Sequence, residues 1–250
     1  MPQTPRPPPP PLSDDIALFL DVDGALLPFA AAPDGVAASP ALKARLGELQ
    51  ARLDGAIALV SGRRLADLDR LFAPLSLASA GLHGLERRGR DGEVAQARDA
   101  AQALDRVRAA AQVIAARYDG AVVEDKGVAL AFHWRAAPLA ASDFQALAAT
   151  AAMELPDYHL QPGDHVAELR PAGADKGTAI AAFLAEPPFA GRMPVFVGDD
   201  LTDEHGFEAV NLRGGRSVLV GTREPSAATF GLADVAAVHR WLGVAGEPAA

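Results

Sequence analysis

Four short, continuous apolar runs constrain the fold of this 250-residue chain more than any other feature. A small or acidic residue follows each run directly, and the runs are residues 16–20, 57–60, 195–197 and 217–220. A continuous apolar run of this length is typical of a strand that is buried on both faces, as in a parallel sheet. Half of the residues are hydrophobic, so the chain can bury a sizeable core around such strands.

Helical patterns separate these runs. Ser39 and Pro40 provide an N-cap and a first-turn proline for a helix that ends near Leu53. Residues 64–72 and 176–184 have helical patterns as well. Strands that alternate with helices predict an α/β fold with a doubly wound, mostly parallel, Rossmann-like sheet.

The middle of the chain follows a different pattern. It contains an Ala-rich helical stretch over 92–118, a helical pattern near 141–153, and strand-like segments at 121–124, 127–134, 157–161 and 165–169. Short strands that lie close together in sequence favour an antiparallel sheet over another strand–helix unit. We therefore expect a smaller α+β cap domain over residues 91–172, inserted into a core domain formed by residues 13–90 and 173–245.

Residues 1–12 are mostly proline and predict a disordered, extended tail. The N-terminal segment lacks the apolar stretch of a signal peptide, and no run of about 18 apolar residues could span a bilayer. We therefore expect a cytoplasmic protein that does not associate with membranes. No sequence feature determines the oligomeric state, and a monomer is the working expectation.

The charge balance is acidic, with a net charge of −9 and a pI near 5.1. This balance argues against a nucleic-acid partner, because nucleic-acid binding requires a basic surface. It also means that a local cation must attract any anionic substrate. The chain has no cysteine, which excludes disulfides and thiolate catalysis, and its histidines lack the H-x-x-x-H spacing of a zinc site.

Acidic residues follow two of the expected strands, at the edge where open α/β sheets bind their ligands. Asp21 and Asp23 come after the first strand, and Asp199 comes after the third. Carboxylates clustered in this way need counter-charges, which Lys176 and a hard divalent cation would supply. Mg²⁺ fits this set, with the side chains of Asp21 and Asp199 and the backbone carbonyl of Asp23 as metal ligands.

The D-x-D spacing also suggests a reaction. One carboxylate can attack phosphorus to form an aspartyl-phosphate, while the other protonates the leaving oxygen and later activates water. A lone D-x-D-G is more often a turn, so this interpretation depends on its joint occurrence with Ser61, Lys176 and Asp199. The loop is no EF-hand, because Ala25 holds the third ligand position, and the spacing from Gly173 to Lys176 is too short for a P-loop.

In four motifs, DVDGALL, LVSGR, DKGTA and VGDDLTDE, the chain resembles the haloacid dehalogenase-like phosphohydrolases. The resemblance extends from about Asp15 to Trp241. It implies that Asp21 is the nucleophile and Asp23 the general acid and base, and that Asp199 binds Mg²⁺.

The same resemblance assigns supporting roles to residues of the other motifs. Ser61, Gly62 and Lys176 would hold the oxygens of the phosphoryl group. Asp200 and Asp203 would orient metal-bound waters or Lys176.

Within that family, the chain is most similar to the trehalose-6-phosphate phosphatases, in the phrases SGRRLADL, GLHGLERR, VEDKGVALAFHWR, ELRPAGADKG and GDDLTDE. Sugar hydroxyls both donate and accept hydrogen bonds, so charged side chains suit them. The substrate-binding residues that the similarity implies are Glu124, Lys126, Glu168, Arg63, His133 and Arg135. The alternative is that the charged residues of the small sheet form its solvent-exposed face.

Two positions depart from the family pattern: Ala25 replaces the usual Thr, and His205 replaces a common acidic residue. The first departure bears on the rate, and we expect the second to lie outside the site. The sequence leaves open a phosphatase for another sugar phosphate, such as sucrose phosphate, a glycosyl-phosphoglycerate or a hexose phosphate. It also leaves open a non-catalytic sugar-phosphate sensor, although such proteins typically lack the nucleophile or the metal aspartate, and both are present here.

Overall fold

The computed structural model describes residues 6–28, 37–89, 94–96, 104–156 and 158–245. The chain divides into two compact units, a larger one formed by Met1–Ala95 and Asp175–Ala250 and a smaller one formed by Gln96–Ala174. The chain passes from the larger to the smaller unit after Ala95, a few residues beyond the boundary expected at residue 91. The reason is that β5, Val94–Gln96, is the edge strand of the larger sheet and not the start of the helix expected from residue 92.

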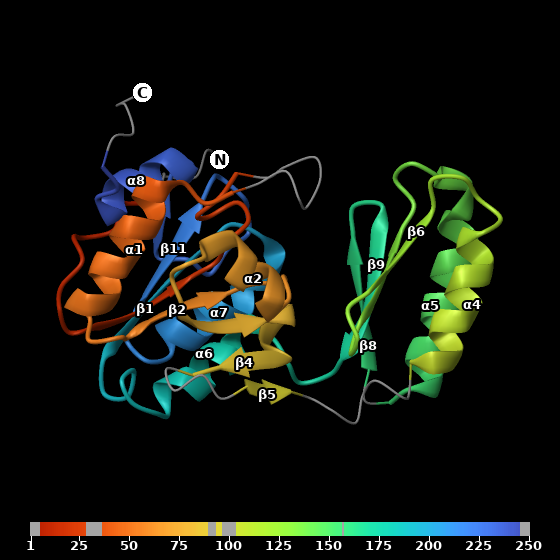
Figure 1. The fold of residues 1–250 in the computed structure, drawn as a ribbon, viewed down its shortest axis with the longest axis horizontal. Coiled ribbons are helices and arrows are strands. Elements are labelled where there is room, and N and C mark those ends of the chain that lie inside the picture. The colour runs from red at the N-terminus through yellow and green to blue at the C-terminus, as the bar shows by residue number, and fades with distance from the viewer. Residues whose placement is uncertain (1–5, 29–36, 90–93, 97–103, 157, 246–250) are drawn as a thin grey trace. The chain divides into compact units, whose positions relative to one another are not determined.

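The larger unit is built on an eight-stranded sheet with the order β12-β11-β10-β1-β2-β3-β4-β5 (Figure 1). The strands besides β5 are β1 Ile16–Leu20, β2 Ile57–Val60, β3 Ala78–Gly81, β4 Glu86–Arg88, β10 Met193–Gly198, β11 Arg216–Val220 and β12 Phe230–Leu232. The strands from β12 to β3 run parallel, and β4 runs antiparallel to β3. This order confirms the predicted mostly parallel α/β sheet.

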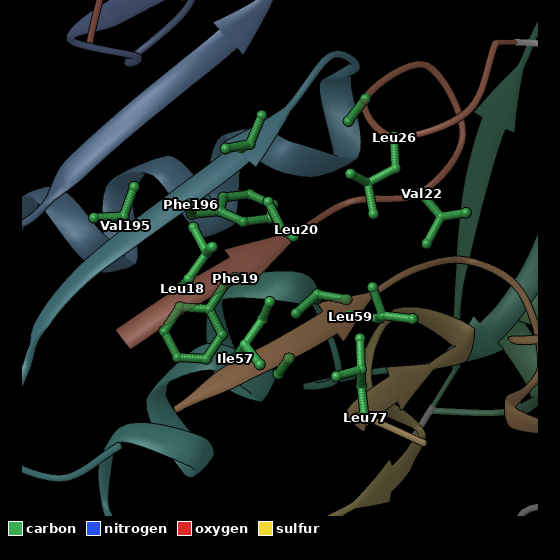
Figure 2. Packing of buried hydrophobic residues seen from close by; sticks show 14 of the residues in the cluster. Leu18, Phe19, Leu20, Val22, Leu26, Ile57, Leu59, Leu77, Val195 and Phe196 are labelled. Atoms are coloured by element: carbon green, nitrogen blue, oxygen red, sulfur yellow. The ribbon is translucent and has the colours of Figure 1, made fainter. Parts of the chain in front are cut away.

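Apolar side chains cover both faces of the central strands, as the continuous apolar runs predicted (Figure 2). Phe19 of β1 and Phe196 of β10 are register partners and therefore lie on the same face. On that face, α6, Lys176–Leu184, places Phe183 6.0 Å from Phe19, between ring centroids. Similarly, α7, Glu204–Asn211, places Phe207 5.4 Å from Phe196. The N-terminus of α6 lies at the end of β1, where Lys176 contacts Asp21.

The remaining helices of this unit are α1, Pro40–Arg52, α2, Leu65–Phe72, and α8, Val235–Leu242. The predicted start of α1 is confirmed, because the Ser39 hydroxyl accepts a hydrogen bond from the Leu42 amide at 3.2 Å. The Arg45 side chain of α1 donates to the Leu242 carbonyl at 2.6 Å, which joins α1 to α8. None of the helices in the described ranges has the length and apolar content to cross a lipid bilayer.

The smaller unit is a four-stranded antiparallel sheet with the order β6-β7-β9-β8, packed against two helices (Figure 1). Its elements are α4 Asp105–Ala115, β6 Val122–Asp125, β7 Leu130–His133, α5 Ala141–Glu154, β8 Tyr158–Gly163 and β9 Val166–Pro171. Leu130 and Phe132 pack into the apolar core that α4 and α5 cover, so their neighbours Ala131 and His133 lie on the opposite face. The antiparallel pairing is the one predicted from the sequence. The predicted helix over 92–118 is shorter, and residues 97–103 lie outside the described part of the chain.

The N-terminal segment differs from its prediction. Residues 6–12 form neither helix nor strand, yet they are bound to the larger unit along their length. The carbonyls of Pro7 and Pro10 accept hydrogen bonds from the Gly231 amide, at 3.0 Å, and from the Trp241 indole, at 2.9 Å. The predicted disorder is therefore wrong for residues 6–12, because an extended proline-rich backbone leaves its carbonyls free to accept bonds. Residues 1–5 lie outside the described residues.

Arg6 allows a test of this anchoring. Its guanidinium pairs with Glu224 and donates to the carbonyls of Ser226, at 3.1 Å, and Ala228, at 2.8 Å. We expect Arg6→Ala to lower the free energy of unfolding by about 1–2 kcal/mol, since two backbone carbonyls and an exposed carboxylate lose their donor. Urea denaturation measures this change, and Arg240→Ala, at an exposed position of α8, is the control. Equal stabilities of the two variants would show that the contacts of Arg6 contribute nothing to the stability of the fold.

Candidate active site

Four of the predicted residues meet at the carboxyl ends of β1 and β10. These strands are neighbours and run parallel, so Asp21, which follows β1, lies beside Asp199, which follows β10. Carboxylate oxygens of Asp21, Asp199 and Asp203 lie within 4.8 Å of one another. Lys176, the first residue of α6, contributes its ammonium group to the same cluster.

The Lys176 ammonium lies between two carboxylates in the protein interior. Nζ is 2.8 Å from Oδ1 of Asp21 and 2.7 Å from Oδ1 of Asp203, and all three side chains are at least 95% buried. Burial opposes the charged amine, but the charges of Asp203 and Asp21 raise the pKa of Lys176 above its ordinary value. Lys176 is therefore a fixed positive charge beside Asp21.

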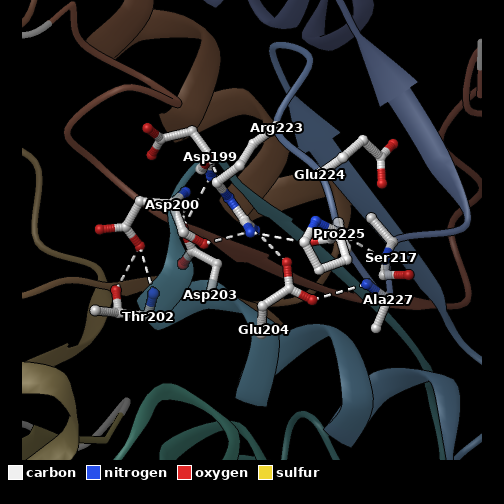
Figure 3. A network of polar contacts seen from close by, with 12 residues as sticks. Asp199, Asp200, Thr202, Asp203, Glu204, Ser217, Arg223, Glu224, Pro225 and Ala227 are labelled. Carbon is white, nitrogen blue, oxygen red and sulfur yellow. Dashed lines mark hydrogen bonds and ion pairs between the residues drawn. The ribbon is translucent and has the colours of Figure 1, made fainter.

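Asp203 organises the loop that carries Asp199 and Asp200 (Figure 3). Its Oδ2 accepts hydrogen bonds from the amides of Asp199, at 2.8 Å, and Asp200, at 3.0 Å. Asp200 in turn caps the short helix Leu201–Asp203, where its Oδ1 accepts from the Thr202 amide at 2.8 Å. Asp200 and Asp203 thus hold the loop of Asp199, and Asp203 also holds Lys176.

The cluster carries more negative than positive charge. Burial, together with the charges of Asp203 and Asp199, raises the pKa of Asp21 well above its ordinary value against the opposing effect of Lys176. Burial and the neighbouring Asp203 and Asp200 raise the pKa of Asp199 to about 7. Oδ1 of Asp199 is buried and accepts no hydrogen bond from any described residue. An unsatisfied carboxylate oxygen in an all-oxygen, acidic cluster fits a hard divalent cation.

Two glycines allow the carboxylates to pack this closely. A Cβ atom on Gly24, where φ is +85°, would lie 2.3 Å from Oδ2 of Asp199. A Cβ atom on Gly198 would lie 2.3 Å from Cγ of Asp203. Any other residue at these positions would displace an acidic side chain of the site.

Asp23 occupies a different environment from Asp21. Its two oxygens accept hydrogen bonds from Nε and Nη2 of Arg63, each at 2.7 Å, in a bidentate pair. The Asp23 side chain is consequently outside the group of carboxylates that could share a metal, which leaves its backbone carbonyl as the predicted ligand. Ser61 is buried at the end of β2, and its hydroxyl accepts from the Arg63 amide at 3.2 Å.

In the smaller unit, four of the predicted substrate residues lie on or next to the sheet. Glu124 on β6 and Glu168 on β9 both pair in register with Ala131, so they lie on the face opposite the helices. Glu168 accepts a hydrogen bond from Lys126 at 3.1 Å, and Glu124 lies 3.0 Å from His133, between Oε2 and Nε2. Arg135 does not join them, because its guanidinium pairs with Asp164 in the exposed β8–β9 turn.

Two further polar residues are not indicated by the sequence motifs. Gln161 on β8 pairs in register with Glu168 and extends the polar row across the sheet. Glu86 on β4 is buried and accepts a hydrogen bond from the Leu65 amide at the start of α2. Side chains alternate between the two faces of a strand, so the predicted strand at 157–161 could have placed Gln161 on the polar face. No local sequence pattern indicates Glu86. Of the two departures from the family pattern, Ala25 is buried and His205 is exposed.

The raised pKa of Asp199 predicts a pH dependence for the metal-free protein. A carboxyl whose folded pKa exceeds its unfolded value of 3.8 stabilises the fold below that value, and this stability is lost as the pH rises towards 7. Asp199→Asn should abolish the loss of stability that the Asp199 carboxyl causes, because an amide does not titrate. We expect the variant to gain on the order of 2–4 kcal/mol relative to the parent protein between about pH 4 and pH 8.

Urea denaturation in a chelating buffer at both pH values measures this gain. Glu208→Gln, which alters an exposed carboxylate on α7, is the control. Parallel stability profiles for the parent protein and Asp199→Asn would contradict the electrostatic description of the cluster.

Comparison with known proteins agrees with this geometry. The family model described as trehalose-phosphatase matches residues 19–236. A probable trehalose-phosphate phosphatase of Sinorhizobium fredii is 46% identical over 219 residues, which cover 87% of this chain and 82% of that protein. The trehalose-6-phosphate phosphatase of Escherichia coli is 42% identical over 240 residues, which cover 93% and 87%.

Solved structures lead to the same family. The crystal structure of a trehalose-6-phosphate phosphatase related protein is 26% identical with a TM-score of 0.72, over 90% of this chain and 94% of that one. The family model spans most of the chain, and the relatives are similar over most of their own length. The chain therefore belongs to the trehalose-phosphatase family.

Proposed function

We propose that this protein hydrolyses trehalose 6-phosphate to trehalose and phosphate, with Mg²⁺ as cofactor, in trehalose biosynthesis. One observation carries the catalytic part of the proposal: Lys176 is buried between Asp21 and Asp203, beside an unsatisfied oxygen of Asp199. Such a group is costly to bury and would be replaced by apolar residues if only stability mattered. The named activities of the similar proteins support the choice of substrate.

In the first step, Asp21 is the nucleophile. Lys176 fixes Oδ1 of Asp21 at 2.8 Å, so the other oxygen is available to attack phosphorus in line with the leaving group. A bond forms between this oxygen and phosphorus while the bond from phosphorus to the sugar oxygen breaks. An ammonium has three N–H donors, and two contact carboxylates, so the third can bind a phosphoryl oxygen together with Ser61 and Gly62.

Asp23 supplies the proton for the departing sugar oxygen. Both of its oxygens now accept hydrogen bonds from Arg63, so a protonated Asp23 requires the guanidinium to move away. A substrate phosphate offers Arg63 another anion, and guanidinium binds phosphate as readily as carboxylate. We therefore assign to Arg63 a substrate-binding role that also frees Asp23.

In the second step, Asp23 takes a proton from water, which attacks phosphorus and breaks the bond to Asp21. Asp21 returns to its carboxylate form beside Lys176. Bound Mg²⁺, held by Asp21, Asp199 and the carbonyl of Asp23, would neutralise the charge that accumulates on the transferring phosphoryl group. Asp200 and Asp203 keep the loop of Asp199 in position throughout the cycle.

We assign sugar binding to the face of the smaller sheet that the helices leave uncovered. Glu124, Lys126, His133 and Glu168 supply both acceptors and donors there, as the hydroxyls of a disaccharide require. A phosphatase for another sugar phosphate would use the same chemistry with different contacts on this face. A non-catalytic sensor is disfavoured, since nucleophile and metal aspartate are both in place. The cytoplasmic location and monomeric state remain predictions.

A substrate panel tests the function. Phosphate release from trehalose 6-phosphate, sucrose 6-phosphate and glucose 6-phosphate should require Mg²⁺ and strongly favour the trehalose ester. Asp21→Asn should reduce release to background, because the amide cannot form the phosphoryl ester. Equal turnover of all three esters would reject the substrate, and full activity of Asp21→Asn would reject the mechanism.

Glu168→Gln tests the sugar-binding face. We expect kcat/KM for trehalose 6-phosphate to fall about 10–100-fold, since a charged acceptor and its pair with Lys126 are lost. Hydrolysis of para-nitrophenyl phosphate, which has no sugar, should stay within about twofold. Glu154→Gln, at an exposed position of α5, is the matched control. If both substrates lose activity equally, Glu168 has a structural role.

A further inference from the structure

Charged side chains hold the loop of Asp199 and Asp200 from two sides (Figure 3). On the amide side, Oδ2 of Asp203 accepts from both N–H groups, at 2.8 and 3.0 Å. On the carbonyl side, Arg223 donates from Nη2 to the Asp200 carbonyl at 3.0 Å, and its Nε lies 3.4 Å from the Asp199 carbonyl. The family motifs do not include Arg223, which lies in the connection between β11 and β12.

The Arg223 side chain is itself held in place. Nη1 donates to the Pro225 carbonyl at 2.9 Å, and the guanidinium pairs with Glu204 at the start of α7. Glu204 also accepts a hydrogen bond from the Ala227 amide at 2.7 Å. The guanidinium therefore joins three backbone segments: the loop after β10, the first turn of α7 and the β11–β12 connection.

Asp199 depends on its backbone for orientation. Oδ1 is buried and accepts no hydrogen bond, so no donor in the described structure aligns this oxygen. On its other side, the carboxylate packs against the Cα atom of Gly24, which leaves it little room to adjust. A rotation of the peptide between Asp199 and Asp200 would thus move the carboxylate away from Asp21.

We propose that Arg223 is a positioning residue for the metal-binding carboxylate of Asp199. It fixes the carbonyls on one side of the loop as Asp203 fixes the amides on the other. A guanidinium suits this role because its donors form a rigid planar fork, whereas a lysine ammonium is a single point on a flexible stem. The inference rests on the proposed metal-dependent function, and it adds a residue outside the family motifs to the machinery of the site.

Positioning and simple electrostatics predict opposite effects for the same variant. Arg223→Ala removes a positive charge close to the cluster, so electrostatics alone would strengthen the binding of a divalent cation. Loss of the fork instead weakens binding, because Asp199 no longer keeps its orientation. Partners that orient metal ligands typically contribute about 10–100-fold to metal affinity.

The experiment measures metal binding directly. Mn²⁺ is titrated into the substrate-free protein and monitored by electron paramagnetic resonance, with Mg²⁺ competition giving the affinity for the second ion. We expect Arg223→Ala and Arg223→Lys each to bind Mn²⁺ about tenfold or more weakly than the parent protein. Both should need more Mg²⁺ for half-maximal phosphate release while approaching the parental kcat at saturating Mg²⁺.

Arg213→Ala is the matched control, because Arg213 is exposed on the same unit and its guanidinium contacts only the Ala209 carbonyl among the described residues. The proposal is overturned if Arg223→Ala binds Mn²⁺ as well as this control or more tightly. It is also overturned if both Arg223 variants lose thermal stability in a chelating buffer but keep the parental metal affinity. If Arg223→Ala fails to fold, Arg223→Lys decides the question.

These outcomes separate the inference from the proposed function. A parent protein that binds Mn²⁺ but releases no phosphate from any sugar phosphate would reject the function and leave the role of Arg223 testable by affinity. A parent protein with Mg²⁺-dependent turnover and unchanged affinity in the Arg223 variants would reject the inference alone.

Discussion

The ammonium of Lys176, buried between the carboxylates of Asp21 and Asp203, is the interaction on which the site depends. It connects Asp21, which follows β1, with the loop after β10, and it neutralises only part of the acidic charge around it. Burial, together with this excess negative charge, raises the pKa of Asp21 and of Asp199. Because the protein has a net charge of −9, a bound cation must compensate the negative charge of the cluster before a phosphate ester can bind there.

The acidic cluster is compact because its framework is rigid. Parallel pairing of β1 with β10 brings the two aspartate loops to one edge of the sheet, and α6 enters the same edge with its first residue. Gly24 and Gly198 remove side-chain atoms where the carboxylates need space. Asp203 and Arg223 then hold opposite sides of the Asp199 loop, so the orientation of one ligand is determined by contacts from several segments of the larger unit.

Under the proposed function, the smaller unit determines which sugar is bound, and the larger unit carries the phosphoryl-transfer residues. Its sheet uses one face for an apolar core with α4 and α5, and the strand alternation directs Glu124, His133 and Glu168 to the other. Within that polar face, Lys126 pairs with Glu168, and His133 contacts Glu124. Changes on this face can alter the sugar that is recognised while the phosphoryl-transfer residues stay constant, which is how one reaction can serve several substrates.

The sequence alone determined the parallel sheet, the insertion of a second unit, and the identity of the acidic cluster, because buried strands, helix caps and catalytic motifs are local patterns. Only the tertiary structure decided three other features. Residues 6–12 are anchored because β12 and Trp241 supply donors that are distant in sequence. Arg63 forms an ion pair with Asp23. Arg223, in the connection between β11 and β12, contacts the loop of Asp199 and Asp200. These contacts join residues that local periodicity cannot relate, since they depend on how separate strand ends meet in space.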